Sequence, residues 1–210
     1  MALQIQIMPV TAFRQNCCLL WDDETLEAVL TDVGGDADFV WAEVQKLGVN
    51  LKEIWLTHGH LDHAGGVVDM RGKCRLQVIG PHREDEYLLQ NLPMITAQYG
   101  FPVSPAFEPD AWLNEGESVN VGQYRFEVLH IPGHTPGHVV FYCAQENLLI
   151  GGDVLFYESI GRTDFERSNH ADLVNNIREK LWRLPDETVV ISGHGRSTTI
   201  GHEKQHNPFL

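Results

Sequence analysis

Short apolar runs alternate with polar segments along the chain, and their two periodicities predict both strands and helices. Alternating or unbroken apolar residues over roughly four to eight positions are typical of strands, whereas apolar residues three and four positions apart are typical of an amphipathic helix. Strands are expected at 3–8, 16–21, 26–32, 53–57, 76–79, 117–121, 124–130, 138–143, 147–151 and 188–191. Helices are expected at 36–47, 63–70, 83–90 and 170–183.

The order of these elements predicts a mixed α/β domain in which two sheets pack face to face and the helices lie outside. The segment 91–114 contains Pro93, Pro102, Pro105 and Pro109. Because proline interrupts helices and the interior of sheets, this segment is expected to be an irregular excursion that borders a cleft.

Four potential metal ligands lie directly after the strand expected at 53–57, namely His58, His60, Asp62 and His63. His58 and His60 are two positions apart, so they face the same way on an extended chain and not on a helix. Imidazoles packed this closely repel one another unless a cation lies between them. One ion could bind all four ligands only with strain, because Asp62 and His63 are adjacent and point in different directions. The segment therefore predicts a metal site and favours two ions.

Three further candidate ligands lie downstream. His134 lies in the segment 132–138, where two prolines and two glycines fix an irregular turn. Asp153 and His194 each follow an apolar strand. The seven candidates together suit two ions that share one carboxylate. His138 opens a strand and is expected to support the site or the core rather than to bind metal.

Composition places the chain among ordinary globular proteins. Its 210 residues are 43% hydrophobic and 21% charged, which fits one domain over residues 1–210. No apolar run approaches the roughly 20 residues of a membrane span. The amino-terminal residues alternate like a strand and lack the basic start of a signal peptide. The four cysteines show no metal-site spacing, and the adjacent Cys17 and Cys18 rarely form a bridge, so a cytoplasmic location is expected.

The formal net charge of −14 argues against a nucleic-acid partner, because phosphate binding needs a basic surface. No membrane partner is expected either. Bound divalent cations would offset part of the negative charge at the site itself, so a small anionic substrate remains compatible with the composition. A monomer or a small homo-oligomer is expected.

The order H-x-H-x-D-H, then P-G-H-T-P-G-H, then G-D, then G-H-G resembles the metallo-β-lactamase superfamily, and within it the glyoxalase II group in a short, single-domain form. The resemblance implies an α/β fold, an αββα sandwich of two mixed β-sheets with helices on the outer faces, without a carboxy-terminal helical extension. It also implies a ligand set: His58, His60 and His134 for one ion; Asp62, His63 and His194 for the other; and Asp153 bridging the two. Zinc is the expected metal, with iron or manganese as alternatives.

The same resemblance implies part of the substrate site. In glyoxalase II enzymes the loop that follows the bridging aspartate carries a basic residue and a tyrosine that hold glutathione. Arg162 keeps the positive charge, whereas Asp164 stands where the tyrosine would be. Arg196 likewise replaces a tyrosine after the last histidine. Arg162 and Arg196 are the candidate substrate-binding residues, and glutathione recognition is expected to be only partly preserved.

These residues favour hydrolysis of a thioester. A divalent ion lowers the pKa of a bound water to roughly 7, so hydroxide is available at neutral pH. A thiolate leaves without prior protonation, whereas an amide nitrogen needs a proton donor. Asp62 is the one candidate acid beside the cluster and is assigned a catalytic role. Hydroxyacylglutathione, such as S-lactoylglutathione, is the substrate that the resemblance implies.

Two alternatives remain open at this point. One is hydrolysis of another small thioester or ester. The other is redox chemistry: the segment 161–165 also resembles persulfide dioxygenases, which hold a single iron with the equivalents of His58, His134 and Asp153. Two histidines and one carboxylate form the triad that suits oxygen activation at iron.

Overall fold

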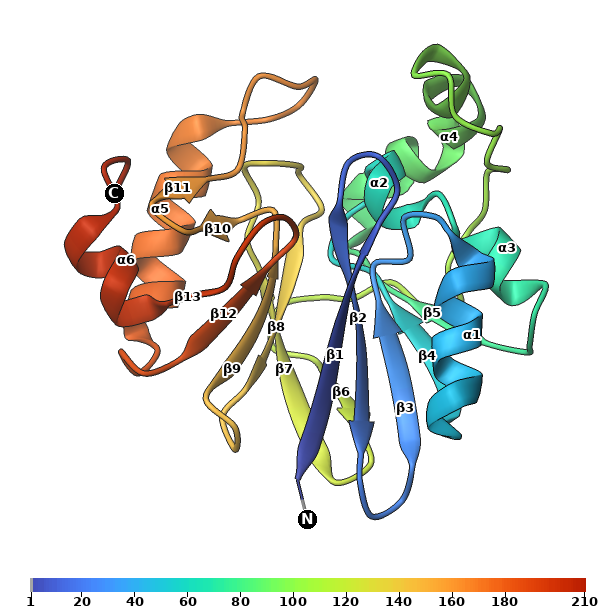
Figure 1. The fold of residues 1–210 in the computed structure, drawn as a ribbon. Coiled ribbons are helices and arrows are strands. Elements are labelled where there is room, and N and C mark those ends of the chain that lie inside the picture. Colours follow the sequence, from blue (N-terminus) through green and yellow to red (C-terminus); the bar gives the residue numbers. More distant parts are fainter. Residues whose placement is uncertain (1) are drawn as a thin grey trace.

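Two β-sheets lie face to face in the computed structural model, which describes residues 2–210 (Figure 1). The first sheet has the strand order β1 (Leu3–Val10), β2 (Gln15–Asp22), β3 (Glu27–Thr31), β4 (Asn50–Trp55) and β5 (Gln77–Ile79). The second has the order β13 (Thr198–Thr199), β12 (Val189–Ser192), β9 (Leu148–Gly152), β8 (Val139–Cys143), β7 (Tyr124–His130) and β6 (Ser118–Val121). Both sheets combine parallel and antiparallel pairs.

Helices cover the outer face of each sheet, as Figure 1 shows. Against the first sheet lie α1 (Ala37–Leu47), α2 (Leu61–Ala64), α3 (Val67–Arg71), the 3₁₀ turn η1 (Arg83–Asp85) and α4 (Glu86–Gln98). Against the second lie α5 (His170–Lys180), the 3₁₀ turn η2 (Leu181–Arg183) and α6 (Ile200–His206). The αββα sandwich with mixed sheets that the resemblance implies is therefore confirmed.

The core consists of three apolar layers, because each sheet is buried on both faces. Between the sheets, the ring of Trp55 packs against Phe126 and Phe141, with ring centroids 5.3 Å away in each case. Adjacent strand residues point to opposite layers: Leu20 of β2 lies between the sheets, whereas Leu19 packs under the helices of the first sheet. Burial on both faces explains why the strand sequences are nearly continuous apolar runs.

The segment 91–114 differs from its prediction in its first half. Helix α4 does not end near residue 90 but continues through Pro93 to Gln98. Proline removes one backbone hydrogen bond, yet Leu89, Leu92 and Thr96 remain buried along the inner face of the helix. Burial of this face holds the helix together across the proline. The expectation of an irregular excursion is wrong as far as Gln98 and correct from Gly100 to Glu108.

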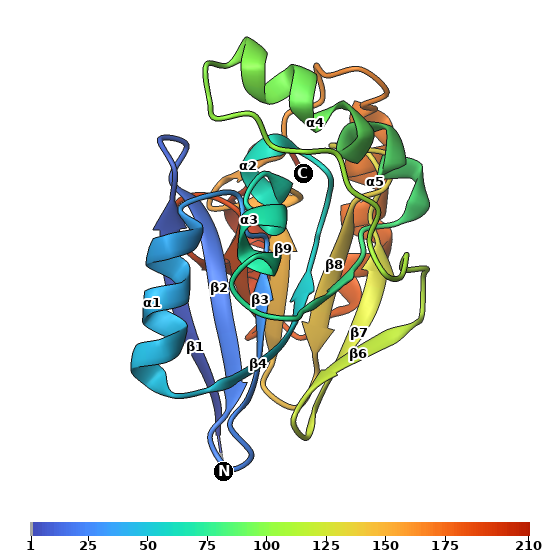
Figure 2. The same cartoon turned by 90° about the vertical axis from the view of Figure 1, so that its right-hand side faces the viewer.

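Several short elements were not predictable from periodicity. The helix expected at 63–70 is divided into α2 and α3 at Gly65 and Gly66, where a Cβ on Gly66 would lie 2.8 Å from the backbone of Gly35. A hairpin of β10 (Leu155–Phe156) and β11 (Ser159–Ile160) follows the second sheet's central strand. Figure 2 shows α2 and α4 above the upper ends of the strands, far from the amino terminus. The candidate ligands lie at this upper end.

Candidate metal centre

All seven candidate ligands meet at one edge of the sandwich, although they come from five separate segments. His58 and His60 follow β4, and Asp62 and His63 lie in α2. His134 lies in the loop between β7 and β8, and the two remaining residues follow β9 and β12. Their side-chain ligand atoms form three overlapping groups, each within 4.8 Å: His58, His60 and His134; His58, His63 and Asp153; Asp62, His63 and His194.

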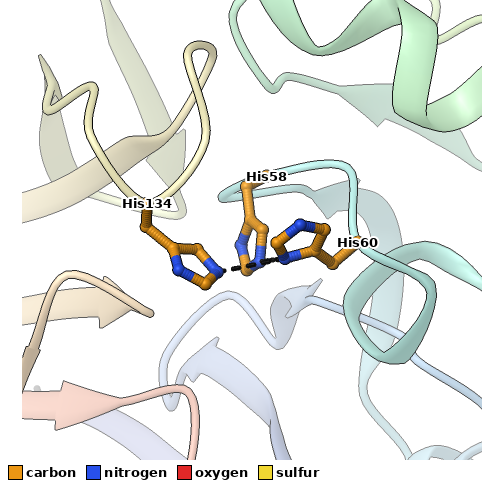
Figure 3. A group of neighbouring side chains, drawn as sticks. All are labelled: His58, His60 and His134. Atoms are coloured by element: carbon orange, nitrogen blue, oxygen red, sulfur yellow. Dashed lines mark hydrogen bonds between the residues drawn. The ribbon is translucent and has the colours of Figure 1, made fainter. Parts of the chain in front are cut away.

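The first group consists of three histidines whose ring nitrogens converge, as Figure 3 shows. Nδ1 of His60 lies 3.0 Å from Nε2 of His58 and 3.0 Å from Nε2 of His134. Two nitrogens each roughly 2.0–2.1 Å from one tetrahedral ion would lie about 3.3 Å apart. The observed spacing is close to that value, so this group fits a single ion with three nitrogen ligands.

The group on the other side of the centre consists of one carboxylate and two histidines, Asp62, His63 and His194. Oδ2 of Asp62 lies 3.1 Å from Nε2 of His194 and 3.9 Å from Nε2 of His63. Asp153 lies between the two groups: its Oδ2 is 3.6 Å from Nε2 of His134 and 3.7 Å from Nε2 of His194. One carboxylate therefore reaches both groups, which is the arrangement expected for a ligand shared by two ions.

Two buried polar atoms at this centre support ion binding. Nε2 of His63 and Oδ1 of Asp153 have no hydrogen-bond partner among residues 2–210, although they lie 3.3 Å apart. Leaving buried polar atoms unpaired costs free energy. A divalent ion would satisfy both atoms at once, so the residues of the centre fit the metal that the ligand set implies.

Hydrogen bonds behind the centre fix which nitrogen His58, His134 and His194 present. Nδ1 of His134 donates to the carbonyl of Arg162 at 2.8 Å, and Nδ1 of His194 donates to the carbonyl of Phe13 at 3.1 Å. Nδ1 of His58 lies 3.0 Å from the Thr57 hydroxyl, which itself donates to Asp32. With Nδ1 protonated, Nε2 has a free lone pair directed at the centre.

Asp32 is a supporting residue that the sequence analysis missed. Its carboxylate accepts hydrogen bonds from the backbone N–H of Thr57 at 2.8 Å and from the Thr57 hydroxyl at 2.7 Å, and it lies 3.0 Å from Nδ1 of His63. It follows the buried end of β3, just as the candidate ligands follow their strands. That shared position is the signal that could have found it.

Asp85 is the second supporting residue that was missed. Its carboxylate accepts hydrogen bonds from the backbone N–H of Gly59 at 2.9 Å, the hydroxyl of Thr135 at 2.8 Å and the backbone N–H of Gly137 at 2.6 Å. It thus joins the His58–His60 loop to the His134 loop. Burial raises the pKa of Asp85 to about 6, against the effect of these hydrogen bonds. An aspartate in a turn gives no sequence signal for such a role.

His138 lies behind the ligands. Its Nε2 accepts the backbone N–H of Asp153 at 3.0 Å, and its ring stacks on that of His58 with centroids 4.6 Å apart. The side chain is fully buried. It belongs to none of the three ligand groups, in line with the expected supporting role.

Burial lowers the pKa values of the histidines at the centre, whereas neighbouring carboxylates raise the pKa of one of them. Burial, reinforced by His134, lowers the pKa of His60 to about 3, and burial also lowers the pKa of His58 well below its usual value. Burial alone would lower the pKa of His63, but Asp153 and Asp32 raise it well above its usual value. The three-histidine group is thus neutral and ready to bind a cation, whereas His63 holds a proton that a metal ion would replace.

Asp62 remains ionised. Burial alone would raise its pKa, but His63 and a hydrogen bond to His194 lower it below its usual value. Asp62 is therefore suited to ligation or to accepting a proton, and not to donating one.

A pocket of about 610 Å³ lies above the centre. Its floor includes His60, Asp62, His134, Asp153 and His194. The remaining lining is mostly apolar: Phe13, Leu61, Leu88, Leu92, Met94, Ile95, Phe156, Ile160 and Phe165, with Tyr87 and Tyr99 beside them. The centre is therefore reached from a cleft with apolar walls.

The two candidate substrate-binding arginines lie in different places. Arg162 lines the pocket, where its Nε and Nη2 donate to the Asp164 carboxylate at 2.9 and 2.8 Å and its guanidinium lies 4.5 Å from the centre of the Phe165 ring. Arg196 is not among the lining residues in the described chain. Its guanidinium instead stacks on the ring of Tyr157 at 3.2 Å from the ring centre.

Comparison with known proteins places the chain in a family. The family model of the metallo-beta-lactamase superfamily matches residues 10–194. The chain belongs to that superfamily, as its motifs predict, and it is a metallo-hydrolase with a histidine and aspartate cluster able to bind metal.

Individual members of the superfamily are similar to this chain over nearly its whole length. The chain is 45% identical to hydroxyacylglutathione hydrolase GloC of Haemophilus influenzae, over 99% of this chain and 98% of that protein. Among solved structures it is similar to BLEG-1 B3 metallo-beta-lactamase, with 37% identity, a TM-score of 0.91 and 99% of each chain covered. It is also similar to TTHA1623 in a di-iron-bound form, with 33% identity, a TM-score of 0.88 and coverage of 98% and 100%. No helix within residues 2–210 is long and apolar enough to cross a membrane.

Proposed function

We propose that this protein hydrolyses the thioester of hydroxyacylglutathione, with S-lactoylglutathione as the reference substrate. The observation that carries the proposal is the position of the Asp153 carboxylate between two ligand groups at the floor of an open pocket. The 45% identity to a hydroxyacylglutathione hydrolase over nearly the whole chain supports the choice of thioester.

The residues at the floor have defined roles in this proposal. His58, His60 and His134 would hold one divalent ion, and Asp62, His63 and His194 the other, with Asp153 shared. Two bound ions supply a hydroxide nucleophile at neutral pH and stabilise negative charge on the carbonyl oxygen. Zinc is the proposed metal, and iron or manganese would suit the same nitrogen and oxygen ligands.

Asp62 carries the proposed catalytic role through its charge. Because its pKa is lowered, Asp62 stays ionised, and its carboxylate can accept a hydrogen bond from an attacking water and orient it. The leaving thiolate needs no proton donor, so thioester cleavage does not depend on a carboxylic acid with a raised pKa on the pocket floor. An amide substrate would be disfavoured for the same reason.

The persulfide dioxygenase alternative uses only part of the centre. It would need His58, His134 and Asp153 with one iron, and it leaves the group of Asp62, His63 and His194 without a function. The convergence of that second group favours the hydrolase.

The test measures metal content and activity in the same protein sample. Elemental analysis should give two ions per chain, and the metal-loaded protein should hydrolyse S-lactoylglutathione without oxygen uptake on glutathione persulfide. One iron per chain, with rapid oxygen uptake and no thioester hydrolysis, would replace this proposal with the dioxygenase.

A further inference from the structure

The pocket has two apolar walls that come from different halves of the chain. One wall consists of a stripe formed by Leu88 and Ile95 of α4 and by Tyr99 just after it, together with Phe13 from the turn between β1 and β2. The other consists of the side chains from the β10–β11 hairpin and the loop after it: Phe156, Ile160 and Phe165. Figure 1 shows α4 and this loop on opposite sides of the upper end of the sandwich.

Helix α4 is apolar on two faces, and only one of them packs on the protein core. Leu89 and Thr96 lie on the inner face and are buried. The outer stripe lines the pocket, and Tyr99 at its end is 57% exposed. Phe13 stacks on Phe101, with ring centroids 5.1 Å apart, and also contacts Tyr99. A second apolar face directed at a cleft is a surface that a ligand would cover.

One aromatic side chain of each wall stands beside one ligand group, whereas Phe156 of the second wall also lies near His194, with ring centroids 6.5 Å apart. The carbonyl of Phe13 holds His194, which belongs to the group with Asp62. The ring of Phe165 lies 4.8 Å from that of His60 and 5.7 Å from that of His134, in the three-histidine group. A substrate that spans both groups can therefore extend one end toward Phe13 and the other end toward Phe165.

Charge decides which end of a thioester goes to which wall. Arg162 is the single lysine or arginine that lines this pocket within residues 2–210, and it lies over Phe165. Glu166 also lines the pocket beside Phe165, so the carboxylates and the ammonium group of a glutathione would each have an oppositely charged partner on that side. The wall of Phe13 and α4 carries no cation, so it is left for the acyl group.

We propose that the preferred substrates are 2-hydroxyacyl thioesters with an acyl chain longer and more apolar than lactoyl, whose chain lies against Phe13 and α4. This inference rests on the proposed function and specifies its acyl group. Water supplies the oxygen that bonds to the carbonyl carbon as the C–S bond breaks. The products are a 2-hydroxy acid and glutathione, and the second hydrogen of the water ends on the thiol.

The hydrophobic effect sets the expected preference. The cavity of about 610 Å³ must hold the glutathione part as well as the acyl group, so the expected preference depends on the apolar wall that the acyl chain meets rather than on empty volume. Each methylene transferred from water to an apolar surface strengthens binding by up to about fourfold, and partial burial gives less. Three added methylenes should therefore raise kcat/KM by about tenfold.

The first test uses a series of substrates that differ only in chain length, namely the S-lactoyl, S-(2-hydroxybutanoyl) and S-(2-hydroxyhexanoyl) derivatives of glutathione. Their reacting groups are electronically alike, so differences in kcat/KM report the pocket. We expect a rise of about tenfold from the first to the last. A flat or falling series, with lactoyl hydrolysed, would overturn the inference and leave the proposed function intact. No hydrolysis of any member would overturn both.

The second test changes the wall. In Ile95→Ala, the ratio of kcat/KM for the hexanoyl and lactoyl substrates should fall several-fold. Gln90→Ala changes an exposed position of α4 outside the pocket lining and should keep the parent ratio.

Calorimetry with the unreactive thioethers S-hexylglutathione and S-methylglutathione gives a readout that needs no catalysis. S-hexylglutathione has five more methylenes than S-methylglutathione, so at the same increment per methylene we expect it to bind about fortyfold more tightly. Equal affinities, or an unchanged ratio in Ile95→Ala, would contradict the proposal.

Discussion

The floor of the pocket and the walls above it differ in how their side chains are held. At the floor and directly beneath it, four histidines each have Nδ1 within hydrogen-bond distance of an oxygen of a neighbouring residue, so their rings are fixed before any ion binds. On the walls, Phe13 and Met94 remain 38% and 52% exposed and are positioned by apolar contacts. Such contacts are less directional than hydrogen bonds.

This difference separates the residues that hold the metal for the reaction from the residues that select the substrate. A change on the floor disturbs several buried polar groups together, because they share Asp32, Asp85 and Asp153 as partners. A change on a wall alters the shape that the substrate meets and leaves the ligands in place. We therefore expect floor variants to lose metal and rate with every substrate, and wall variants to change which substrate is preferred.

Asp153→Ala should have the largest effect. It removes the carboxylate that reaches both ligand groups, so both ions should bind more weakly and activity should fall roughly a hundredfold or more. Elemental analysis after dialysis, together with hydrolysis of S-lactoylglutathione, measures both effects. Asp69→Ala removes an exposed aspartate of α3 and serves as the control. Full occupancy by two ions in Asp153→Ala would contradict the bridging role.

Asp32→Asn tests the support behind the floor. The amide can replace only one of the two carboxylate oxygens that accept from Thr57 and face His63. Loss of such a supporting carboxylate typically costs ten- to a hundredfold in metal affinity. We expect a loss in this range when metal is titrated against a competing chelator, with the fold retained by circular dichroism. Unchanged metal affinity would show that the ligands are held without Asp32.

The same contrast explains what the sequence could predict. The convergence of the candidate ligands could be predicted because each of them follows an apolar strand or lies in a fixed turn, as at His58, His194 and His134. The strands were readable because both faces of each sheet are buried. The α4 wall was not readable, because Pro93 suggested an irregular segment and the burial of Leu89 and Leu92 that overrides it is a tertiary effect.

The supporting aspartates were hidden for a different physical reason. Asp32 and Asp85 act through hydrogen bonds to residues 25 to 52 positions away in the chain. A single aspartate in a turn is common, so only the folded structure shows which of them are buried and fully bonded. The stacking of Arg196 on Tyr157 was likewise visible only in the structure.

Arg162→Ala and Arg196→Ala distinguish the two candidate substrate-binding residues. Arg162 lines the pocket, but its side chain is 67% exposed, so its contact with a glutathione carboxylate is screened by solvent. We expect KM for S-lactoylglutathione to rise about three- to fivefold with kcat nearly constant, the result of lost uniform binding. Arg196→Ala should leave KM within about twofold. A larger effect in Arg196→Ala would place the glutathione on the Tyr157 side.

Asp164→Asn should have the smallest effect on KM, and it should lower KM, whereas Arg162→Ala raises it. Both oxygens of Asp164 are bonded to the guanidinium of Arg162, so the aspartate competes with a substrate carboxylate for that group. Removing its charge should free Arg162 and lower KM about twofold, and added salt should reduce the difference because exposed charges are screened. Asp172→Asn, an exposed aspartate of α5, is the control. A higher KM in Asp164→Asn would show instead that Asp164 contacts the ammonium group of the glutathione, and that the two side chains bind the two charges of its amino-acid end together.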